Sequence, residues 1–388
     1  MKTLSTIDFQ NIKSAGVRVD FNVPINENFK ITDDTRLLRA VDTIKFIKEK
    51  KCKILLISHF GRPKDNFELK YSFQNLIEQF SKILNENINL ISYESFSQNG
   101  LTNFKQSKEN IFLLDNIRFF KGEKINDLNF SKNITDHLDL YINEAFSASH
   151  RSHASVNQMV KNIQSLPGFN FEKEIIAINE IKNSSKRKLA IIGGSKVSTK
   201  INTLLSLTKS CSNIFIGGAM ANNFLKFKDV PVGDSLLEEG SEKMIEEIYN
   251  LAKKSRCEIH LPLDIVTDKV EKYSIDKLST VSNFKILDLS DNSINLLDNL
   301  ILKSEIVLWN GPMGMIENEN FAHGSSKLAS LLANCSSQVV IGGGDTLLAI
   351  NIAGINFDQF HFVSTAGGAF LEALENKQLP GVEALNLS

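Results

Sequence analysis

The feature that most restricts the fold of this chain is a series of short apolar runs in which hydrophobic and polar residues do not alternate. Examples are "CKILLIS", "IFLLD", "LAIIGG", "EIHLPLDIV", "EIVLWNG" and "QVVIGG". A strand that is apolar at every position is buried on both faces, which is typical of parallel sheets covered by helices. Amphipathic stretches such as "TRLLRAVDTIKFIKEK" and "SEKMIEEIYNLAKKS" lie between the runs. This alternation predicts an α/β fold of strand–helix–strand units.

The length of 388 residues is typical of two or three domains. A helical pattern, "FEKEIIAINEIKNSS", lies near the middle of the chain, directly after "LPGFN". We interpret it as a helix that joins two α/β domains. The sequence therefore predicts a first domain at residues 1–168, a connecting helix at 169–185 and a second domain at 186–373.

Composition excludes several classes of partner. The formal net charge is -1, so a charged ligand must be bound by a local cluster, and no nucleic-acid partner is expected. No apolar run approaches the ~20 residues of a membrane span, and no membrane partner is expected. The four cysteines are far apart and form no C-x-x-C pair, which favours reduced thiols and a cytoplasmic protein. They are Cys52, Cys211, Cys257 and Cys335.

Polar and basic residues follow the apolar runs of the first half. Ligands of open parallel sheets bind outside the carboxyl ends of the strands, where these side chains are expected to converge. Arginine and histidine together suit a small multivalent anion, because arginine offers a two-pronged donor to carboxylate or phosphate. The pair His150 and His153 could also suggest zinc, but no third ligand has metal spacing nearby. The residues in question are Asp20, Asn22, His59, Arg62, Arg118, His150 and Arg151.

Glycines follow the apolar runs of the second half. A single glycine pair after a strand is often only a tight turn, but five such sites in one half favour a ligand. Glycine lets backbone N–H groups and helix N-termini approach a phosphate or a flat base closely. The sites are Gly193–Gly194, Gly217–Gly218, Gly311, Gly342–Gly344 and Gly367–Gly368.

Two lysines and one aspartate extend this interpretation. The stretch "KLAIIGGSKVSTKI" is not a P-loop, which needs Gly-x-x-x-x-Gly-Lys-Ser/Thr. If a helix begins after Gly194, Lys196 and Lys200 lie in its first turns, where cations oppose the helix dipole unless an anion is bound. In "VVIGGGDTLLAI", Asp345 follows a glycine turn. One carboxylate beside nucleotide phosphates is a suitable ligand for Mg²⁺.

These motifs together resemble the phosphoglycerate kinase family. The resemblance rests on "RVDFNVP", "ITDDTR", "SHFGRP", "DNIRFFKGE", "YINEAFSASHRSHAS", "IIGGSKVSTKI", "GDSLLEEG", "LPLDIV", "VLWNGPMGMIE", "FAHGS", "VVIGGGDT", "FVSTAGGA" and "NKQLPGV", in order from near residue 17 to near residue 385. It implies a monomer of two Rossmann-like domains facing a cleft, with the tail 374–388 packed on the first. It implies Mg²⁺-dependent, reversible phosphoryl transfer between 1,3-bisphosphoglycerate and ADP, giving 3-phosphoglycerate and ATP.

The resemblance also assigns residues. The phosphoglycerate ligands would be Asp20, Asn22, Arg36, His59, Arg62, Arg118 and Arg151. The nucleotide ligands would be Gly194, Lys200, Gly217, Gly218, Asn310, Pro312, Glu317, Gly343, Gly344, Asp345 and Thr346. The groups expected to act on the phosphoryl group in transit are Arg36, Lys196, Lys200 and the backbone N–H groups of Gly367 and Gly368. Asp345 would hold the metal.

Some positions depart from the family's pattern. Glu144 and Ser147 stand in "NEAFS" where the family has "NDAFG", and Asp115 stands in "DNIRF" where it has "ENVRF". Ala366 and Phe370 replace glycine and serine in "TAGGAF", and a Cβ at Ala366 is expected to crowd a glycine conformation or to block one close approach. The family's D-I-G-P-K-T segment, which helps to wall the adenine site, is absent before "VLWNGP".

Two alternatives to an active kinase can be weighed. A nicotinamide dehydrogenase is disfavoured, because no Gly-x-Gly-x-x-Gly follows an apolar run. A catalytically impaired paralogue that acts as a binding protein is the other alternative. The joint presence of Arg36, Lys196, Lys200 and Asp345 favours the active enzyme, since a pure scaffold has no need of all four.

Overall fold

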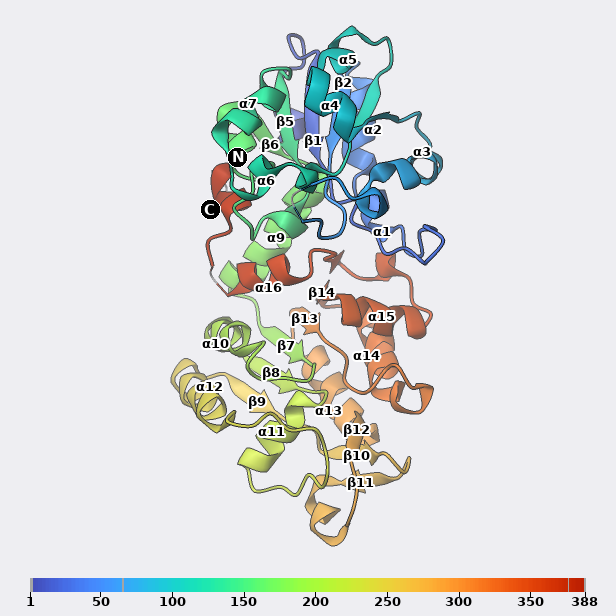
Figure 1. Ribbon diagram of the computed structural model, residues 1–388. Helices are drawn as coiled ribbons and strands as arrows, with labels where there is room; N and C mark the ends of the chain where they lie inside the picture. Colours follow the sequence, from blue (N-terminus) through green and yellow to red (C-terminus); the bar gives the residue numbers. More distant parts are fainter. Residues whose placement is uncertain (1–2, 65, 376, 387–388) are drawn as a thin grey trace. The chain divides into compact units, whose positions relative to one another are not determined.

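The chain divides into two compact units in a computed structural model that describes residues 3–64, 66–375 and 377–386 (Figure 1). The first unit comprises Met1–Ile175 together with Gln378–Ser388, and the second comprises Ile176–Lys377. Helix α9 (Phe169–Asn183) contains the first boundary between them. The polypeptide therefore leaves the first unit through a helix and returns to it after the second unit is complete.

The first unit is built on a six-stranded sheet in the order β3-β4-β2-β1-β5-β6, in which every neighbouring pair is parallel. Its strands are β1 (Ser14–Arg18), β2 (Lys53–Ile57), β3 (Asn89–Ile91), β4 (Ile111–Leu114), β5 (Leu140–Asn143) and β6 (Ser165–Pro167). Because β2 and β5 pair with opposite edges of β1, the strand order reverses there. Such a switch point leaves a crevice for ligands at the carboxyl ends of the strands.

Helices cover this sheet because its strands are buried on both faces. On one face Val17 and Leu56 pack against residues of α1, α2 and α3 in the main hydrophobic core of the unit. The helices of the unit are α1 (Thr35–Arg39), α2 (Val41–Glu49), α3 (Ile77–Leu84), α4 (Tyr93–Asn99), α5 (Thr102–Gln106), α6 (Lys121–Lys124), α7 (Leu128–Thr135), α8 (Gln158–Asn162) and α17 (Pro380–Ala384). The last of these is held to the unit by hydrogen bonds, including one of 3.0 Å from the N–H of Gly381 to the carbonyl of Ser149.

The second unit repeats this plan with a six-stranded parallel sheet in the order β15-β14-β13-β7-β8-β9. Its strands are β7 (Lys188–Ile192), β8 (Asn213–Ile216), β9 (Glu258–His260), β13 (Ile306–Asn310), β14 (Gln338–Gly342) and β15 (Phe362–Val363). Here the order reverses at β7, between β8 and β13. The carboxyl ends of these three strands therefore meet at one place.

The helices of the second unit lie on both faces of its sheet (Figure 1). Residues of α13, α14 and α15 form one core with Leu189, Ile191 and Trp309, while α10 and α12 lie together on the other side. They are α10 (Ile201–Ser210), α11 (Met220–Phe227), α12 (Glu242–Ser255), α13 (Asp291–Leu302), α14 (His323–Asn334), α15 (Gly344–Ile352) and α16 (Gly368–Leu374). The predicted fold class, two parallel α/β sheets covered by helices, is confirmed.

A small antiparallel sheet in the second unit differs from the expectation. The run "EIHLPLDIV" is not one strand: it divides at Pro262, which cannot donate to a sheet ladder, into β9 and β10 (Asp264–Thr267). Strand β10 pairs with β11 (Lys272–Ser274) and β12 (Ile286–Leu289) in the order β11-β10-β12. This sheet supplies one wall of the cavity described below.

Within the described ranges, no helix has both the length and the apolar character needed to span a bilayer.

Candidate functional site

In the first unit, basic side chains follow the carboxyl ends of β4 and β2, which are neighbours, and of β5, which lies on the other side of β1. His59 follows β2, Arg118 lies in the short turn after β4, and Arg151 lies in the loop after β5. The electrostatic effect of both arginines reaches the imidazole of His59, together with those of Arg18 and Arg36. The charges of four guanidinium groups therefore act on one histidine; three of these arginines, Arg36, Arg118 and Arg151, belong to the set that the sequence predicts for an anion.

Arg36 is placed by residues that follow β1. Its Nη1 donates to the carbonyl of Asn22 at 3.1 Å and lies 3.2 Å from Oδ2 of Asp20. Asp20 also accepts a hydrogen bond of 2.6 Å from Ser147. The guanidinium of Arg36 remains about one-third exposed, with a side-chain accessibility of 35%. It is thus oriented by the protein and still open to a ligand.

The loop after β2 is held by two of the predicted ligands. The backbone N–H of Gly61 donates to Oδ1 of Asn22 at 2.8 Å, and Nη1 of Arg118 donates to the carbonyl of Gly61 at 2.7 Å. Arg62, the next residue, is exposed. Asn22 and Arg118 therefore have a structural role in the loop, whereas the side chain of Arg62 lies at the surface.

Arg18 belongs to this cluster although the sequence interpretation missed it. It lies at the end of β1 and is 1% exposed. Its Nε donates to Oγ of Ser155 at 2.8 Å, its Nη2 donates to Nδ1 of His59 at 3.1 Å, and its Nη1 donates to the carbonyl of Val19. The signal in the sequence was an arginine inside the apolar run "GVRVDF", since a buried guanidinium needs dedicated partners.

The cluster is electrostatically strained without an anion. Burial, and then the charges of Arg18, Arg118, Arg151 and Arg36, lower the pKa of His59 well below its usual value. Burial, and then Arg151 and Arg18, lower the pKa of Arg118 to about 10. Both shifts mean that an added positive charge is disfavoured here, so a bound anion would relieve the repulsion.

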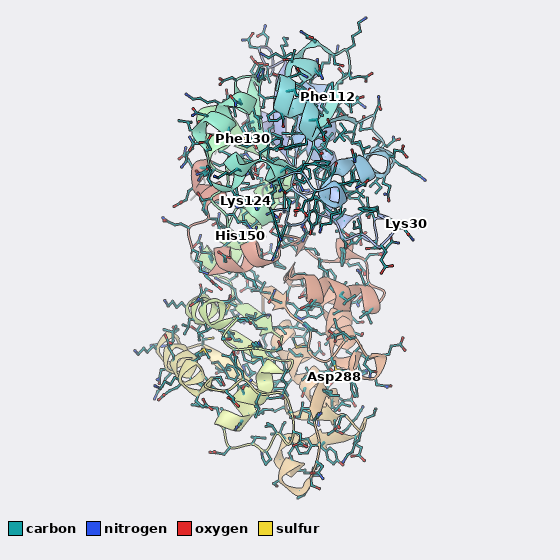
Figure 2. All side chains as sticks on the ribbon, viewed as in Figure 1. Lys30, Phe112, Lys124, Phe130, His150 and Asp288 are labelled. Atoms are coloured by element: carbon teal, nitrogen blue, oxygen red, sulfur yellow. The ribbon has the colours of Figure 1, made fainter. Side chains whose placement is uncertain are left out.

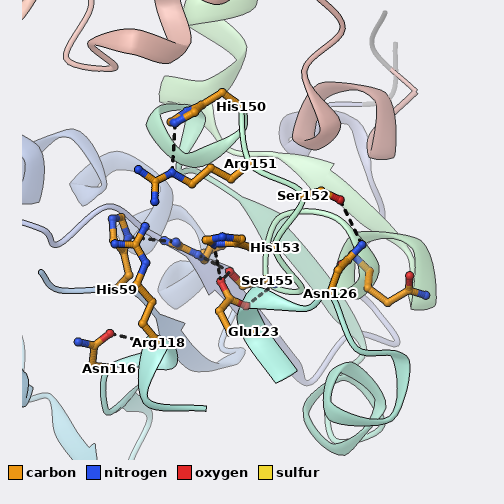
Figure 3. A network of polar contacts seen from close by, with 12 residues as sticks. His59, Asn116, Arg118, Glu123, Asn126, His150, Arg151, Ser152, His153 and Ser155 are labelled. Atoms are coloured by element: carbon orange, nitrogen blue, oxygen red, sulfur yellow. Dashed lines mark hydrogen bonds and ion pairs between the residues drawn. The ribbon is translucent and has the colours of Figure 1, made fainter. Parts of the chain in front are cut away.

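A buried carboxylate lies on the inner side of the cluster (Figure 3). Glu123 in α6 accepts hydrogen bonds from Oγ of Ser155 at 2.6 Å and from the backbone N–H of Ser155 at 2.8 Å. Nδ1 of His153 lies 3.8 Å from Glu123, and burial with the nearby arginines lowers the pKa of His153 to about 4. His150 accepts from Nε of Arg151 at 3.1 Å. The histidine pair thus belongs to the anion cluster.

In the second unit, a cavity of about 470 Å³ opens at the carboxyl ends of β7, β8 and β13. Its apolar wall includes Leu225 of α11 and Ile265 and Leu289 of the small sheet. The predicted nucleotide residues that line it are Gly194, Gly218, Pro312, Glu317 and Asp345. A flat apolar group with a charged end matches such a cavity.

Behind this cavity, hydrogen bonds among polar groups connect the ends of three strands. Nζ of Lys200 donates to the carbonyl of Gly193 at 2.7 Å and to Oδ1 of Asn310 at 2.5 Å. Nδ2 of Asn310 donates to the carbonyl of Gly342 at 2.7 Å, and Thr346 accepts from the N–H of Gly311 at 2.7 Å. Burial lowers the pKa of Lys200 to about 8, although the charge of Asp345 raises it.

The glycines of this region allow close backbone contact. A Cβ at Gly218, whose φ is +62°, would lie 2.7 Å from the nitrogen of Gly194 and 2.9 Å from the oxygen of Pro312. A Cβ at Gly193 would lie 2.0 Å from the same oxygen. These glycines are needed for packing between strand ends. By contrast, a Cβ at Gly344, Gly367 or Gly368 would meet nothing within 4 Å.

The expected position of the two lysines was wrong in one respect. Helix α10 begins at Ile201, with Lys200 as its N-cap residue, so the residues from Ser195 to Thr199 form a loop rather than a first turn. Lys196 is exposed in that loop. It therefore does not oppose the dipole of the helix, whereas Lys200 lies at the helix start, where burial lowers its pKa to about 8.

Asp345 has the properties of a candidate metal ligand. It is exposed in the first turn of α15, after Gly343 with a φ of +99°, and it lines the cavity. Among the described residues, no three His, Cys, Asp or Glu side chains gather into a metal site. A single carboxylate fits Mg²⁺ only if a ligand's phosphates and water complete its coordination.

The structure tolerates the residues that depart from the family's pattern. The backbone at Ala366 does not adopt a positive φ, so the expected crowding of a glycine conformation is absent. The ring of Phe370 is buried against Gly342, where a Cβ would lie 2.7 Å from it. Residues 285–289, which include the buried Asp288 labelled in Figure 2, wall the cavity despite the missing D-I-G-P-K-T segment.

A small-molecule kinase needs a site for an anionic substrate and a site for a nucleotide. The first unit has a cluster of basic side chains, and the second has a glycine-lined cavity beside a partly buried lysine. The family model described as "Phosphoglycerate kinase" matches residues 4–377. The chain is 40% identical to the phosphoglycerate kinase of Prochlorococcus marinus strain MIT 9312, over 99% of this chain and 98% of that protein. It is 36% identical to that of Wolbachia sp. subsp. Drosophila simulans strain wRi, with the same coverage.

Solved structures agree with this match. The structure of phosphoglycerate kinase from Coxiella burnetii aligns with a TM-score of 0.89 and 32% identity, covering 99% of this chain and 98% of that one. The enzyme from Pyrococcus horikoshii OT3 aligns with a TM-score of 0.82 and 26% identity, covering 100% and 99%. This chain belongs to the phosphoglycerate kinase family.

Proposed function

We propose that this chain catalyses the reversible transfer of a phosphoryl group between 1,3-bisphosphoglycerate and ADP, giving 3-phosphoglycerate and ATP. The observation that carries the proposal is the full-length family match joined to the convergence of Arg18, Arg36, Arg118 and Arg151 on His59. Such a cluster has the charge and the paired donors that a phosphorylated acid requires. No observation favours the impaired paralogue.

In this proposal the first unit binds the phosphoglycerate. Arg118, Arg151 and His59 bind its anionic groups, and Arg62 adds a surface contact. Asp20 and Asn22 hold Arg36 and the loop at Gly61 in place, as their hydrogen bonds indicate. The substrate's charge adds to the counter-charge that Asp20 and Glu123 supply among the arginines, which favours binding of the fully ionised acid.

The second unit binds the nucleotide. The base and ribose would occupy the cavity lined by Gly194, Gly218, Pro312 and Glu317. The phosphates would lie at the start of α15, near Gly343, Gly344 and Thr346, and at Lys200. The protonated, partly buried Lys200 would exchange its contact with Asn310 for a phosphate oxygen. Gly217 leaves room for the side chain of Met313, whose sulfur would lie 2.4 Å from a Cβ at this position.

Mg²⁺ would be held by Asp345 and the nucleotide, and when bound it would neutralise phosphate charge. The other contributions to transfer would come from the chain's own groups. Phosphoryl transfer needs positioning and charge stabilisation rather than a protein nucleophile. Arg36, Lys196, Lys200 and the N–H groups of Gly367 and Gly368 are proposed to bind the equatorial oxygens in transit. Both Gly367 and Gly368 leave space for this approach.

The test is a coupled assay of the purified chain with 3-phosphoglycerate, ATP and Mg²⁺. Turnover that requires all three is expected. Binding of phosphoglycerate without turnover would contradict the proposal and support the impaired paralogue instead.

We further propose a cytoplasmic monomer, supported by four unpaired thiols and by one chain that carries both proposed ligand sets. Sedimentation and cell fractionation would test this part.

A further inference from the structure

The hydrogen bonds of Arg18 fix the state of His59. Arginine can only donate hydrogen bonds, so Nδ1 of His59, at 3.1 Å from Nη2 of Arg18, must be an acceptor and carry no hydrogen. Burial, and then the nearby positive charges, lower the pKa of His59 and keep its ring neutral. A neutral imidazole with a bare Nδ1 carries its hydrogen on Nε2. His59 is therefore a donor at Nε2 and cannot be an acceptor there.

Arg18 is itself held by a defined acceptor. Its Nε donates to Oγ of Ser155 at 2.8 Å. The single hydroxyl hydrogen of Ser155 is directed at Oε1 of Glu123, 2.6 Å away. Because that hydrogen is used, only the lone pairs of Oγ face Arg18. The hydrogen bonds from Arg18 to Ser155 and from Ser155 to Glu123 share one direction, inward to the buried carboxyl group, whereas the hydrogen bond from Arg18 to His59 runs outward.

Glu123 is well suited to end such a chain. It is 0% exposed and accepts on both oxygens, from Oγ and from the backbone N–H of Ser155. Figure 3 shows Glu123 and Ser155 together beside His153, on the inner side of the arginines. Burial raises the pKa of Glu123, while Arg18 and the hydrogen bonds from Ser155 lower it, and both of its oxygens act as acceptors toward Ser155. Hydrogen bonds that share a direction strengthen one another in a low-dielectric interior.

We propose that Glu123 and Ser155 are positioning residues that, through Arg18, hold His59 in its Nε2–H form so that it donates a hydrogen bond to the anionic substrate. The identity of that substrate rests on the proposed function. Neither Glu123 nor Ser155 needs to touch it. The wrong tautomer would place a lone pair against a carboxylate or phosphate oxygen, which repels it.

Ser155→Ala is the sharpest test, because it separates this role from a structural one. The substitution removes the hydroxyl but keeps the backbone hydrogen bond from residue 155 to Glu123, so the loop stays attached to α6. Loss of one such hydrogen bond is expected to raise the KM for 3-phosphoglycerate roughly tenfold. The KM for ATP is expected to stay within about twofold.

Asn126→Gly is the matched control. Asn126 attaches the same loop through a 3.3 Å hydrogen bond from its Nδ2 to Oγ of Ser152, visible in Figure 3, and is outside the chain of bonds to His59. Its φ of +57° suits glycine, so the backbone is preserved. If anchoring of the loop were the cause, both variants would raise the KM for 3-phosphoglycerate equally, and the proposal would fail.

A second readout does not need activity. Nitrogen chemical shifts of labelled histidine, with His59 assigned by a His59→Gln variant, report which ring nitrogen carries the hydrogen. We expect the Nε2–H form in the unmodified chain and a mixture in Glu123→Gln and Ser155→Ala. A hydrogen on Nδ1 in the unmodified chain would overturn the proposal even if both variants failed to fold. Absence of phosphoglycerate turnover with Nε2–H intact would instead contradict only the proposed function.

Discussion

A guanidinium buried at the end of an apolar strand is costly unless its nitrogens meet acceptors. Arg18 meets this requirement with Ser155, Val19 and His59. Those partners lie far from it in sequence, except for Val19. The sequence could show that an arginine stood among apolar residues, but not which residues would surround it. Residues that follow strands, such as His59 and Arg118, could be predicted, because strand ends converge whatever the loop conformation.

At Arg36 we predict an effect on the rate of transfer rather than on binding. Its guanidinium is oriented by Asp20 and Asn22 while remaining partly exposed. Removal of one preorganised donor from developing charge typically costs on the order of 10²–10³ in rate. Arg36→Ala should therefore lower kcat by about this factor, with a small change in the KM for phosphoglycerate. Steady-state kinetics check it, and an unchanged kcat with only a raised KM would indicate a plain binding role.

At Asp345 we predict a selective loss of nucleotide use. The side chain is exposed at the start of α15 and lines the cavity, so its removal should disturb no packing. Asp345→Ala should weaken Mg-nucleotide binding at least about tenfold, as expected for loss of a charged ligand. Phosphoglycerate affinity should be unchanged. Calorimetry with each ligand separately measures this.

The control for that experiment is Asp358→Ala, which removes an exposed acid from the same unit outside the cavity. It should affect neither ligand. Equal losses for both ligands in Asp345→Ala, or loss for neither, would refute the metal assignment.

At the scale of elements, the fold is stabilised where glycine lets two strand ends approach closely. Gly218 and Gly354 both have positive φ, of +62° and +68°, but only Gly218 has backbone atoms within 3 Å of a built Cβ. Gly354→Ala should cost about 1–2 kcal/mol of unfolding free energy, from its left-handed backbone alone. Gly218→Ala should cost more, by roughly 1–3 kcal/mol, and should also weaken nucleotide binding. Denaturant unfolding compares them, and equal costs would show that the close approach does not matter.

Glu144 links one element to another. Its buried carboxyl group accepts from the backbone N–H groups of Asn170 and Phe171 in the first turn of α9, at 3.0 and 3.2 Å, and from Thr43 at 3.0 Å. Burial raises its pKa to about 8, although these hydrogen bonds and Lys173 lower it. The folded state therefore holds a proton that the unfolded chain loses near pH 4.5. Stability from this group is present below that pH and is lost as the pH rises through about 8.

We therefore predict that Glu144→Gln becomes relatively more stable as the pH rises. The difference in unfolding free energy between variant and unmodified chain should shift in the variant's favour by roughly a few kcal/mol between about pH 5 and about pH 8.5. Denaturant titrations at both pH values measure it. Glu172→Gln, in the same first turn, should show no such trend. A pH-independent difference for Glu144→Gln would mean that Glu144 is ionised throughout.

The elements themselves were predictable to different degrees. Long parallel strands such as β7 and β13 could be predicted, because burial on both faces demands continuous apolar sequence. The three-stranded sheet could not. Its short strands β11 and β12 form by pairing with β10, and "KYS" and "ILDL" have no pattern of their own that specifies this. The start of α10 was also misplaced, because Lys200 as N-cap leaves no sequence signal.

At the scale of the whole molecule, we predict that the two substrates together change the arrangement of the units. The residues proposed for phosphoglycerate belong to the first unit and those proposed for the nucleotide to the second. Transfer requires reacting oxygens within about 3–3.5 Å of one another. The radius of gyration from small-angle scattering should be smaller with both substrates than with either alone. The same radius in the free, singly bound and doubly bound protein would refute this closure.

The return of α17 to the first unit has a consequence for how the protein is made. Residues 380 and 381 hydrogen-bond to Asn157 and Ser149, yet they leave the ribosome only after the whole of the second unit. The unit that is synthesised first is therefore the one that is completed last. A chain that ends at residue 377 can therefore complete the contacts of the second unit while the first still lacks a helix. Such a truncated chain, once released, should hold a finished second unit and a first unit that is open to proteolysis around residues 149–157.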